Sequence, residues 1–147
     1  MYLPVFVCLF MHMCRYSFDE VNKMLTKNSG LKGICGKGDF RDVAEGHEQG
    51  DEQSSLAFKM YGYRLHKYIG AYMAVLGGEV DAIVFTAGVG ENSAALRHNV
   101  CNSLRPMGVS LDSFKNKQRG IVDISADDSR YATSRQCGTP LSCVCTK

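Results

Sequence analysis

The 147-residue chain is long enough to bury one sizeable core, so its length predicts a single domain or a piece of one. Hydrophobic residues make up 45% and charged residues 22% of it, which is typical of a soluble globular protein and not of a disordered chain. The net charge is only +2, and the basic residues are interspersed with acids, so neither a nucleic acid nor a membrane is predicted as a partner.

An apolar segment covers residues 2–14. It is too short to cross a bilayer, which needs about 20 apolar residues. It also lacks the preceding basic residue and the following small-residue cleavage site of a secretion signal. We expect a buried strand or a stray terminus here.

The seven cysteines include no CxxC pair and no Cys/His spacing that suits zinc. Cys143 and Cys145 would point to opposite faces of a strand, which makes them a poor chelate. Reduced structural or incidental thiols are therefore favoured over a disulfide or a metal role.

The first half of the chain is predicted to be helical. Ser17 and Glu20 have the spacing of a capping box, and the helix that they start is expected to end at Gly30 in a left-handed conformation. A glycine loop over residues 33–38 follows. Asp39 then caps a short helix that extends to residue 49.

The longest periodic stretch covers residues 51–76, where apolar side chains recur at steps of three and four. It predicts one long helix with a broad apolar stripe. After it, an apolar strand over residues 80–86 leads into a glycine turn at 87–90 and a helix from about 91 to 104. Strand, turn and helix in this order are half of a parallel α/β unit.

Two short strands are expected beyond that unit, at residues 109–111 and 121–122. Past Ser129 the sequence has no periodicity, and no element is predicted there.

The glycine turn is the strongest candidate for a binding site. Gly88 and Gly90 let a ligand approach the backbone, and the N–H groups at the start of the next helix favour anions and nucleotides. Glu91 and Asn92 either cap that helix or contact the ligand. The turn is not a P-loop, and Ser93 stands where a complete dinucleotide fingerprint has a third glycine, so a tight turn without a ligand is an equal alternative.

A second, weaker candidate is Asp39-Phe40-Arg41-Asp42, whose Arg and carboxylate either hold part of a nucleotide or pair with each other. No general-base role is expected for the histidines: His47 lies beside Glu45 and Glu48, His66 is on the polar side of the long helix, and His98 is expected at the surface. Cys101 is expected to be a small core filler.

The order of these motifs resembles the second, C-terminal domain of acetate kinases, over roughly residues 16–130. Four motifs carry the resemblance: SGL-G, D-x-R-D, the helix containing YIGAY, and FT-GxGENSA-xR. The resemblance implies an α/β, ribonuclease-H-like fold of the actin, Hsc70 and sugar kinase superfamily. It also implies phosphoryl transfer between ATP and acetate, with Mg²⁺, in a cytoplasmic homodimer.

Carried over by motif, the resemblance implies two sets of ATP/ADP-binding residues. The adenosine-side contact corresponds to Asp39, Phe40 and Arg41, and the second nucleotide-binding loop to Gly88, Val89, Gly90, Glu91 and Asn92. Ala87 stands where the family usually has glycine, which is expected to be a mild change.

The remaining family motifs are not found. The catalytic Arg, His and Asp residues and the Glu that helps to hold Mg²⁺ have no counterpart, so no catalytic residue and no metal ligand is assigned. We expect an atypical apolar segment at 1–15, the family domain at 16–130 and an atypical tail at 131–147. The resulting hypothesis is a partial, inactive copy of an acetate kinase; the alternatives are a non-catalytic nucleotide-binding or interaction module, or a propionate kinase fragment.

Overall fold

The computed structural model describes residues 8, 11–118 and 120–135. The chain divides into two compact units, residues 1–57 and 58–147. The boundary between them falls inside one long helix, α5 (Glu52–Val75).

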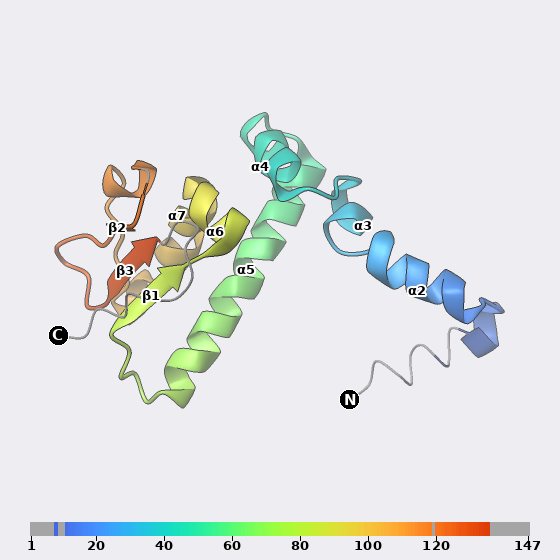
Figure 1. The fold of residues 1–147 in the computed structure, drawn as a ribbon, viewed down its shortest axis with the longest axis horizontal. Coiled ribbons are helices and arrows are strands. Elements are labelled where there is room, and N and C mark those ends of the chain that lie inside the picture. The colour runs from blue at the N-terminus through green and yellow to red at the C-terminus, as the bar shows by residue number, and fades with distance from the viewer. Residues whose placement is uncertain (1–7, 9–10, 119, 136–147) are drawn as a thin grey trace. The chain divides into compact units, whose positions relative to one another are not determined.

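Unit 1 is helical in its described part (Figure 1). Its helices are α2 (Phe18–Lys27), α3 (Leu31–Cys35), α4 (Phe40–Glu48) and the start of α5. The predicted capping box is confirmed, because the Ser17 N–H donates to the Glu20 carboxylate at 2.8 Å and the Glu20 N–H donates to the Ser17 hydroxyl at 3.3 Å. The helix that Asp39 was predicted to cap and the long helix are confirmed as α4 and α5.

Two expectations for this unit are wrong. The loop predicted at residues 33–38 contains helix α3, which lies between Gly30 at φ +66° and the left-handed Gly36. The apolar N-terminal segment is not a buried strand where it is described, because Cys8 and residues 11–14 are helical and mostly exposed. Neither segment has a strong helical pattern, so single-sequence periodicity did not reveal them.

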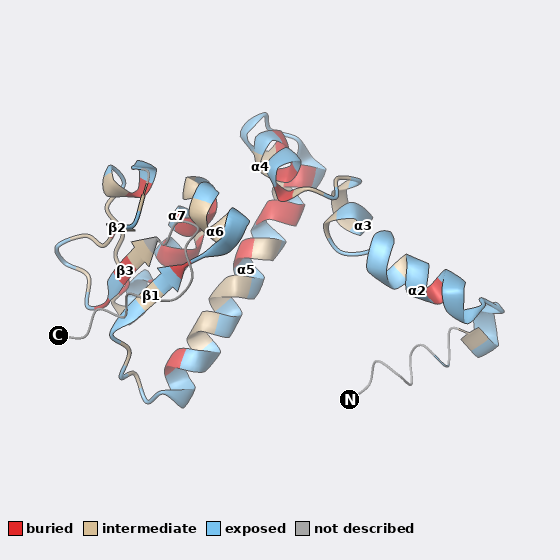
Figure 2. Cartoon of the chain, viewed as in Figure 1, coloured by how far each residue is buried: buried red, intermediate tan, exposed pale blue. Residues whose placement is uncertain are grey.

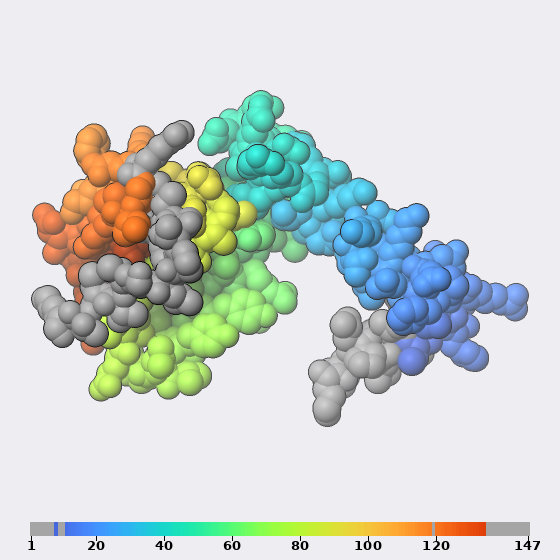
Figure 3. Space-filling model, in the orientation of Figure 1, coloured from blue at the N-terminus to red at the C-terminus, as the bar shows by residue number. Residues whose placement is uncertain are grey.

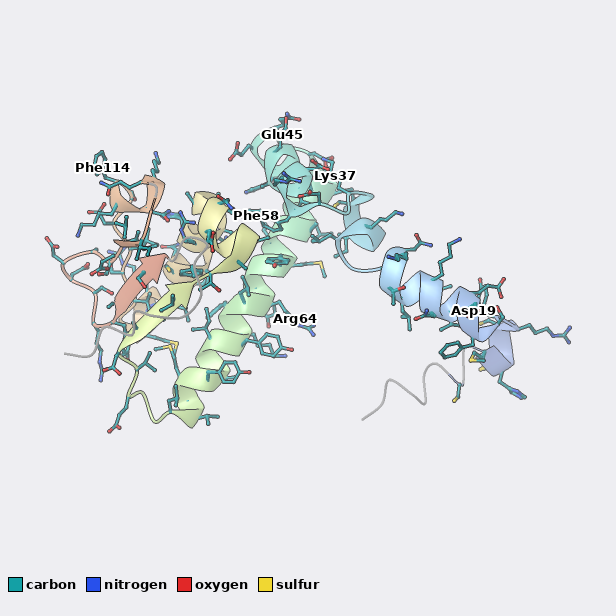
Figure 4. All side chains as sticks on the ribbon, viewed as in Figure 1. Asp19, Lys37, Glu45, Phe58, Arg64 and Phe114 are labelled. Atoms are coloured by element: carbon teal, nitrogen blue, oxygen red, sulfur yellow. The ribbon has the colours of Figure 1, made fainter. Side chains whose placement is uncertain are left out.

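The α4–α5 corner holds the core of unit 1, where Phe40, Val43 and Ala57 are buried (Figure 2). Lys37, labelled in Figure 4, donates from Nζ to the Ser54 hydroxyl at 2.8 Å and lies 3.6 Å from the Asp51 carboxylate. These contacts tie the segment before α4 to the start of α5.

Gly46 is required by this packing. A Cβ at Gly46 would lie 2.8 Å from the Ser54 Cβ, whereas a Cβ at Gly70 of α5 would meet no described heavy atom within 4 Å. Both glycines lie inside helices, where alanine is otherwise preferred by roughly 0.5–1 kcal/mol.

We expect Gly46→Ala and Gly70→Ala to change stability in opposite directions. Overpacking against Ser54 should lower the free energy of unfolding by about 1–3 kcal/mol, and Gly70→Ala should raise it slightly. Urea denaturation followed by circular dichroism measures both. Equal stabilisation by the two substitutions would contradict the close approach at Gly46.

Unit 2 contains a three-stranded sheet of order β1-β3-β2 in its described part (Figure 1). β1 (Ala82–Phe85) pairs in parallel with β3 (Ala132–Arg135), and β3 pairs antiparallel with β2 (Val122–Asp123). The other elements are the helices α6 (Ala87–Asn92) and α7 (Ala94–Ser103) and the 3₁₀ turns η1 (Arg105–Met107) and η2 (Lys115–Lys117). Its core contains buried side chains from α7, from β1 and from the residues that follow α7 and β2: Leu96, Val100, Phe85, Leu104 and Ile124.

The sequence predicted β1, and its short strand at residues 121–122 overlaps β2 at Val122. Three other details of unit 2 differ from the prediction. The glycines of the predicted turn lie inside α6, and the single helix predicted after them is broken at Ser93. The strand expected at 109–111 is reduced to an isolated bridge between Leu111 and Ser125. Strand β3 lies beyond Ser129, where no element was predicted.

Figure 3 shows the chain in space-filling form, with the middle of the sequence, which contains α5, in green. Many of the apolar positions predicted for the 51–76 stretch lie at the surface. The exposed ones are Leu56, Met60, Tyr68, Tyr72 and Leu76. The helix packs closely on α7 within unit 2, because a Cβ at Gly62 would lie 3.6 Å from the Leu96 Cδ1. Within the described ranges, no helix has the length and apolarity to cross a membrane.

Candidate functional site

Strand β1 leads directly into α6, the segment that holds the strongest sequence candidates. Thr86 is the N-cap residue, and its side chain makes no capping hydrogen bond within the described residues. Ala87, the first helical residue, has φ +60°. A left-handed φ is costly for an alanine and nearly free for a glycine, so the Ala87 replacement is not as mild as expected.

The two glycines of α6 have different surroundings. A Cβ at Gly88 would meet no described heavy atom within 4 Å, so the backbone there is open to a ligand. A Cβ at Gly90 would lie 3.4 Å from the Phe85 carbonyl carbon, so Gly90 faces its own strand. Close approach of a ligand is therefore possible at Gly88, and Gly90 serves the packing of α6 on β1.

The other candidates in α6 stabilise or border the helix. The Asn92 amide donates to the Gly88 carbonyl at 2.8 Å, one turn back in α6. The start of α7 is capped by Ser93 instead, whose hydroxyl accepts from the Leu96 N–H at 3.2 Å. Val89 and Glu91 are half-buried.

Arg97 is a buried residue of this site to which sequence analysis gave no role. It is only 1% exposed, and its Nη1 donates to the carbonyls of Gly90 at 2.7 Å and Glu91 at 2.8 Å. Its Nε and Nη2 donate to the side-chain and backbone oxygens of Asn116 at 2.7 and 2.6 Å. The signal that would have revealed it is the arginine that ends the FT-GxGENSA-xR motif.

The second candidate, in unit 1, is an ion pair at the start of α4. The Asp39 carboxylate accepts from the Arg41 N–H at 2.9 Å and from the Arg41 Nη2 at 2.6 Å. The side-chain hydrogen bond from Arg41 is the main cause that lowers the pKa of Asp39 to about 2. Asp39 and Arg41 thus pair with each other, one of the two alternatives left open by the sequence, and the Arg41 side chain is 88% exposed.

Phe40, between the members of this pair, has a different position. It is 7% exposed and belongs to the core of unit 1. Its ring therefore anchors the start of α4, and no open face of the ring is available for a nucleotide base.

The remaining sequence candidates are structural. His98 is exposed, as predicted. His47 and His66 are half-buried, and the His47 Nδ1 lies 2.9 Å from the Ser55 hydroxyl. Cys101 is buried, and burial raises the pKa of its thiol to about 12, which confirms a core filler. Cys137, Cys143 and Cys145 lie outside the described residues. Within the described residues, no group of three or more His, Cys, Asp or Glu could hold a metal ion.

Solved structures of two kinases resemble most of this chain. An acetate kinase from Porphyromonas gingivalis superposes over 90% of this chain and 34% of its own, with a TM-score of 0.78 and 35% sequence identity. A propionate kinase from Francisella tularensis superposes over the same shares with a TM-score of 0.81 and 32% identity. The fold is thus the α/β, ribonuclease-H-like fold of the actin, Hsc70 and sugar kinase class.

The chain belongs to the acetokinase family, whose model matches residues 4–136. The acetate kinase of Helicobacter pylori strain Shi470 is 52% identical over 116 residues, which are 78% of this chain and 29% of that enzyme. The chain therefore spans about a third of the length of the proteins that it matches.

The ion pair at α4 predicts a titration that can be measured. Replacing Arg41 with glutamine removes the charged donor but keeps the backbone N–H, so the pKa of Asp39 should rise from about 2 toward its ordinary value of 3.8 without fully reaching it. Because the native pKa is depressed, the stabilisation that the pair provides is present above pH 4 and is lost as the pH falls through about 2. NMR titration of the Asp39 carboxyl in both proteins tests this, and an unchanged pKa in Arg41→Gln would refute it.

The left-handed Ala87 predicts a stabilising substitution. Ala87→Gly should raise the free energy of unfolding by up to about 1 kcal/mol, because relief of the positive φ outweighs the added freedom of the unfolded chain. Ala95, exposed in α7, is the matched control: there the same change should destabilise by roughly 0.5–1 kcal/mol. Thermal and urea unfolding of both variants measure the difference, and a loss of stability in Ala87→Gly would contradict the strained conformation.

Proposed function

We propose that this chain provides the ATP- and ADP-binding part of an acetate kinase, the enzyme that transfers a phosphoryl group between ATP and acetate. The observation that carries the proposal is the FT-GxGENSA-xR segment, in which an open Gly88 backbone follows a sheet strand directly. Ligands of open α/β sheets bind outside the carboxyl ends of the strands, which is where α6 begins. Membership of the acetokinase family supports the same function.

The two sets of candidate residues have separate roles in this proposal. In unit 2, the first N–H groups of α6 and the open Gly88 backbone approach the phosphate or ribose. In unit 1, Asp39 holds the exposed Arg41 guanidinium in one orientation, from which it contacts the adenosine side. An arginine fixed in this way loses less side-chain entropy when it binds.

The chemistry of phosphoryl transfer assigns these residues to binding. Such transfer depends mainly on positioning and on neutralising the charge that spreads over the phosphoryl oxygens. Mg²⁺ supplies part of that neutralisation in this class of reaction, and the described residues contain no group of three or more His, Cys, Asp or Glu that could hold the ion. We assign no catalytic residue within the chain.

The resemblance to acetate kinases also implies where the whole enzyme acts, how it assembles and which substrates it uses. We expect a cytoplasmic homodimer that acts on acetate and ATP. Propionate is the second candidate substrate, because the Francisella tularensis propionate kinase superposes as well as the acetate kinase does. Comparing kcat/KM for acetate and propionate in the whole enzyme distinguishes the two.

The proposal predicts that ADP binding depends on the open backbone at Gly88. Gly88→Val places a side chain in that space and should weaken ADP binding at least tenfold, with an unchanged circular dichroism spectrum. Isothermal titration calorimetry measures the affinity, and Gly70→Ala, in an equally open helical position of α5, should bind ADP as the unaltered chain does. Gly88 is a sharper position for this test than Gly90, where a side chain would also press on Phe85.

Two outcomes would overturn the proposal. If the unaltered chain binds no ADP, a non-catalytic interaction module becomes the better description. If Gly88→Val binds ADP normally, the α6 segment is only a structural turn. We also expect the 147-residue polypeptide alone to form no acetyl phosphate, detected as the hydroxamate, and synthesis at the rate of a kinase would refute the absence of catalytic residues.

A further inference from the structure

The carbonyl groups near the end of α6 need partners from outside the helix. The last four carbonyls of any α-helix have no N–H partner within it, and those of Gly90 and Glu91 are among them, because α6 ends at Asn92. At Ser93 the backbone is extended, with φ −99° and ψ 90°, and the chain starts α7 in a new direction.

Arg97 supplies these partners. It lies one turn into α7, is buried, and directs both N–H groups of Nη1 to the carbonyls of Gly90 and Glu91. A cation at the carboxyl end of a helix also interacts favourably with the helix dipole.

The guanidinium is itself fixed in orientation. Asn116 of η2 accepts from Nε and Nη2, and the Asn116 amide donates to the Ala94 carbonyl at 2.9 Å. The planar fork of the arginine thus joins α6 to η2, and Asn116 joins η2 to the start of α7. A lysine would bring the charge but not this geometry.

Helix α6 depends on such support. It has six residues, starts at a strained Ala87, and has no described side-chain cap at Thr86. A helix of this length is not stable by itself. The orientation of the Gly88 backbone is therefore set by the contacts of α6 with the rest of unit 2, and the Arg97 hydrogen bonds are the strongest of those described, because their donor is charged.

We propose that Arg97 is a positioning residue for nucleotide binding: it holds the 87–93 segment in the conformation that presents the Gly88 backbone, without touching the nucleotide. The inference rests on the proposed function, since it concerns the same segment.

The test compares Arg97→Lys with Val100→Ala, using the 147-residue chain. Val100 is fully buried one turn further along α7, so its truncation destabilises the same helix without changing the Gly90 and Glu91 contacts. We expect Arg97→Lys to weaken ADP binding at least tenfold per folded molecule and to speed amide hydrogen exchange across residues 87–93. Val100→Ala should leave both near the values of the unaltered chain.

Asn116→Ala keeps Arg97 and its bond to the Asn116 backbone carbonyl, but it removes the side-chain acceptor of Nε and the donor to the Ala94 carbonyl. It provides the readout if Arg97→Lys does not fold. Asn116→Ala should also weaken ADP binding and speed amide hydrogen exchange across residues 87–93, by smaller factors than Arg97→Lys does. Normal ADP affinity and normal exchange in the folded arginine or asparagine variant would overturn the inference. If the unaltered chain binds no ADP, the proposed function fails first, and the exchange measurement alone decides whether Arg97 fixes the segment.

Discussion

Unit 2 is built around strand β3, because it is the strand that pairs on both edges in the described sheet. The Ala132 N–H donates to the Asp81 carbonyl at 3.2 Å on the β1 side, and the Ile124 N–H donates to the Thr133 carbonyl at 2.7 Å on the β2 side. A parallel pair such as β1 and β3 requires a long crossover connection. That crossover contains α6 and α7, and α6 begins it at the carboxyl end of β1.

The same crossover explains why a charged side chain is buried in this small unit. A chain that breaks between α6 and α7 leaves carbonyls without partners, and burying them unpaired would be costly. Arg97 satisfies two of them from the next helix, and Asn116 satisfies the arginine in turn. Fold stability and the geometry of the candidate site therefore depend on one hydrogen-bonded network, which joins residues 90 to 116.

The sequence predicted what is encoded locally. The capping box at Ser17, the cap at Asp39 and the long periodic helix α5 each depend on residues within a few positions of one another, and the structure contains all three. The pairing of Asp39 with Arg41 was one of two alternatives that the sequence predicted, since the two residues are separated by only one position. These features need no tertiary information, so a single sequence is sufficient for them.

Features imposed by distant contacts were not predictable in this way. Strand β3 reads Ala-Thr-Ser-Arg, without the apolar alternation of a strand, and its buried Thr133 is polar, with a hydroxyl that has no partner in the described part of the structure. Its conformation comes from pairing with β1 and β2. Residues 87–90 look like a turn because glycine is a poor helix former, yet they are helical through contacts with β1 and Arg97.

Helix α6 is thus constrained at both ends by interactions that oppose its own preferences. At its start Ala87 holds a positive φ that an alanine avoids, and at its end Arg97 secures carbonyls that a six-residue helix cannot satisfy. A backbone held in this way has little freedom left to lose when a ligand binds, which favours affinity. The strain at Ala87 persists because the surrounding structure determines the conformation there, and such strain is found most often at functional segments. Local rules fail at β3 and also at the segment where the candidate nucleotide site lies, and the second failure is the pattern expected when a fold gives up local preference to shape a binding surface.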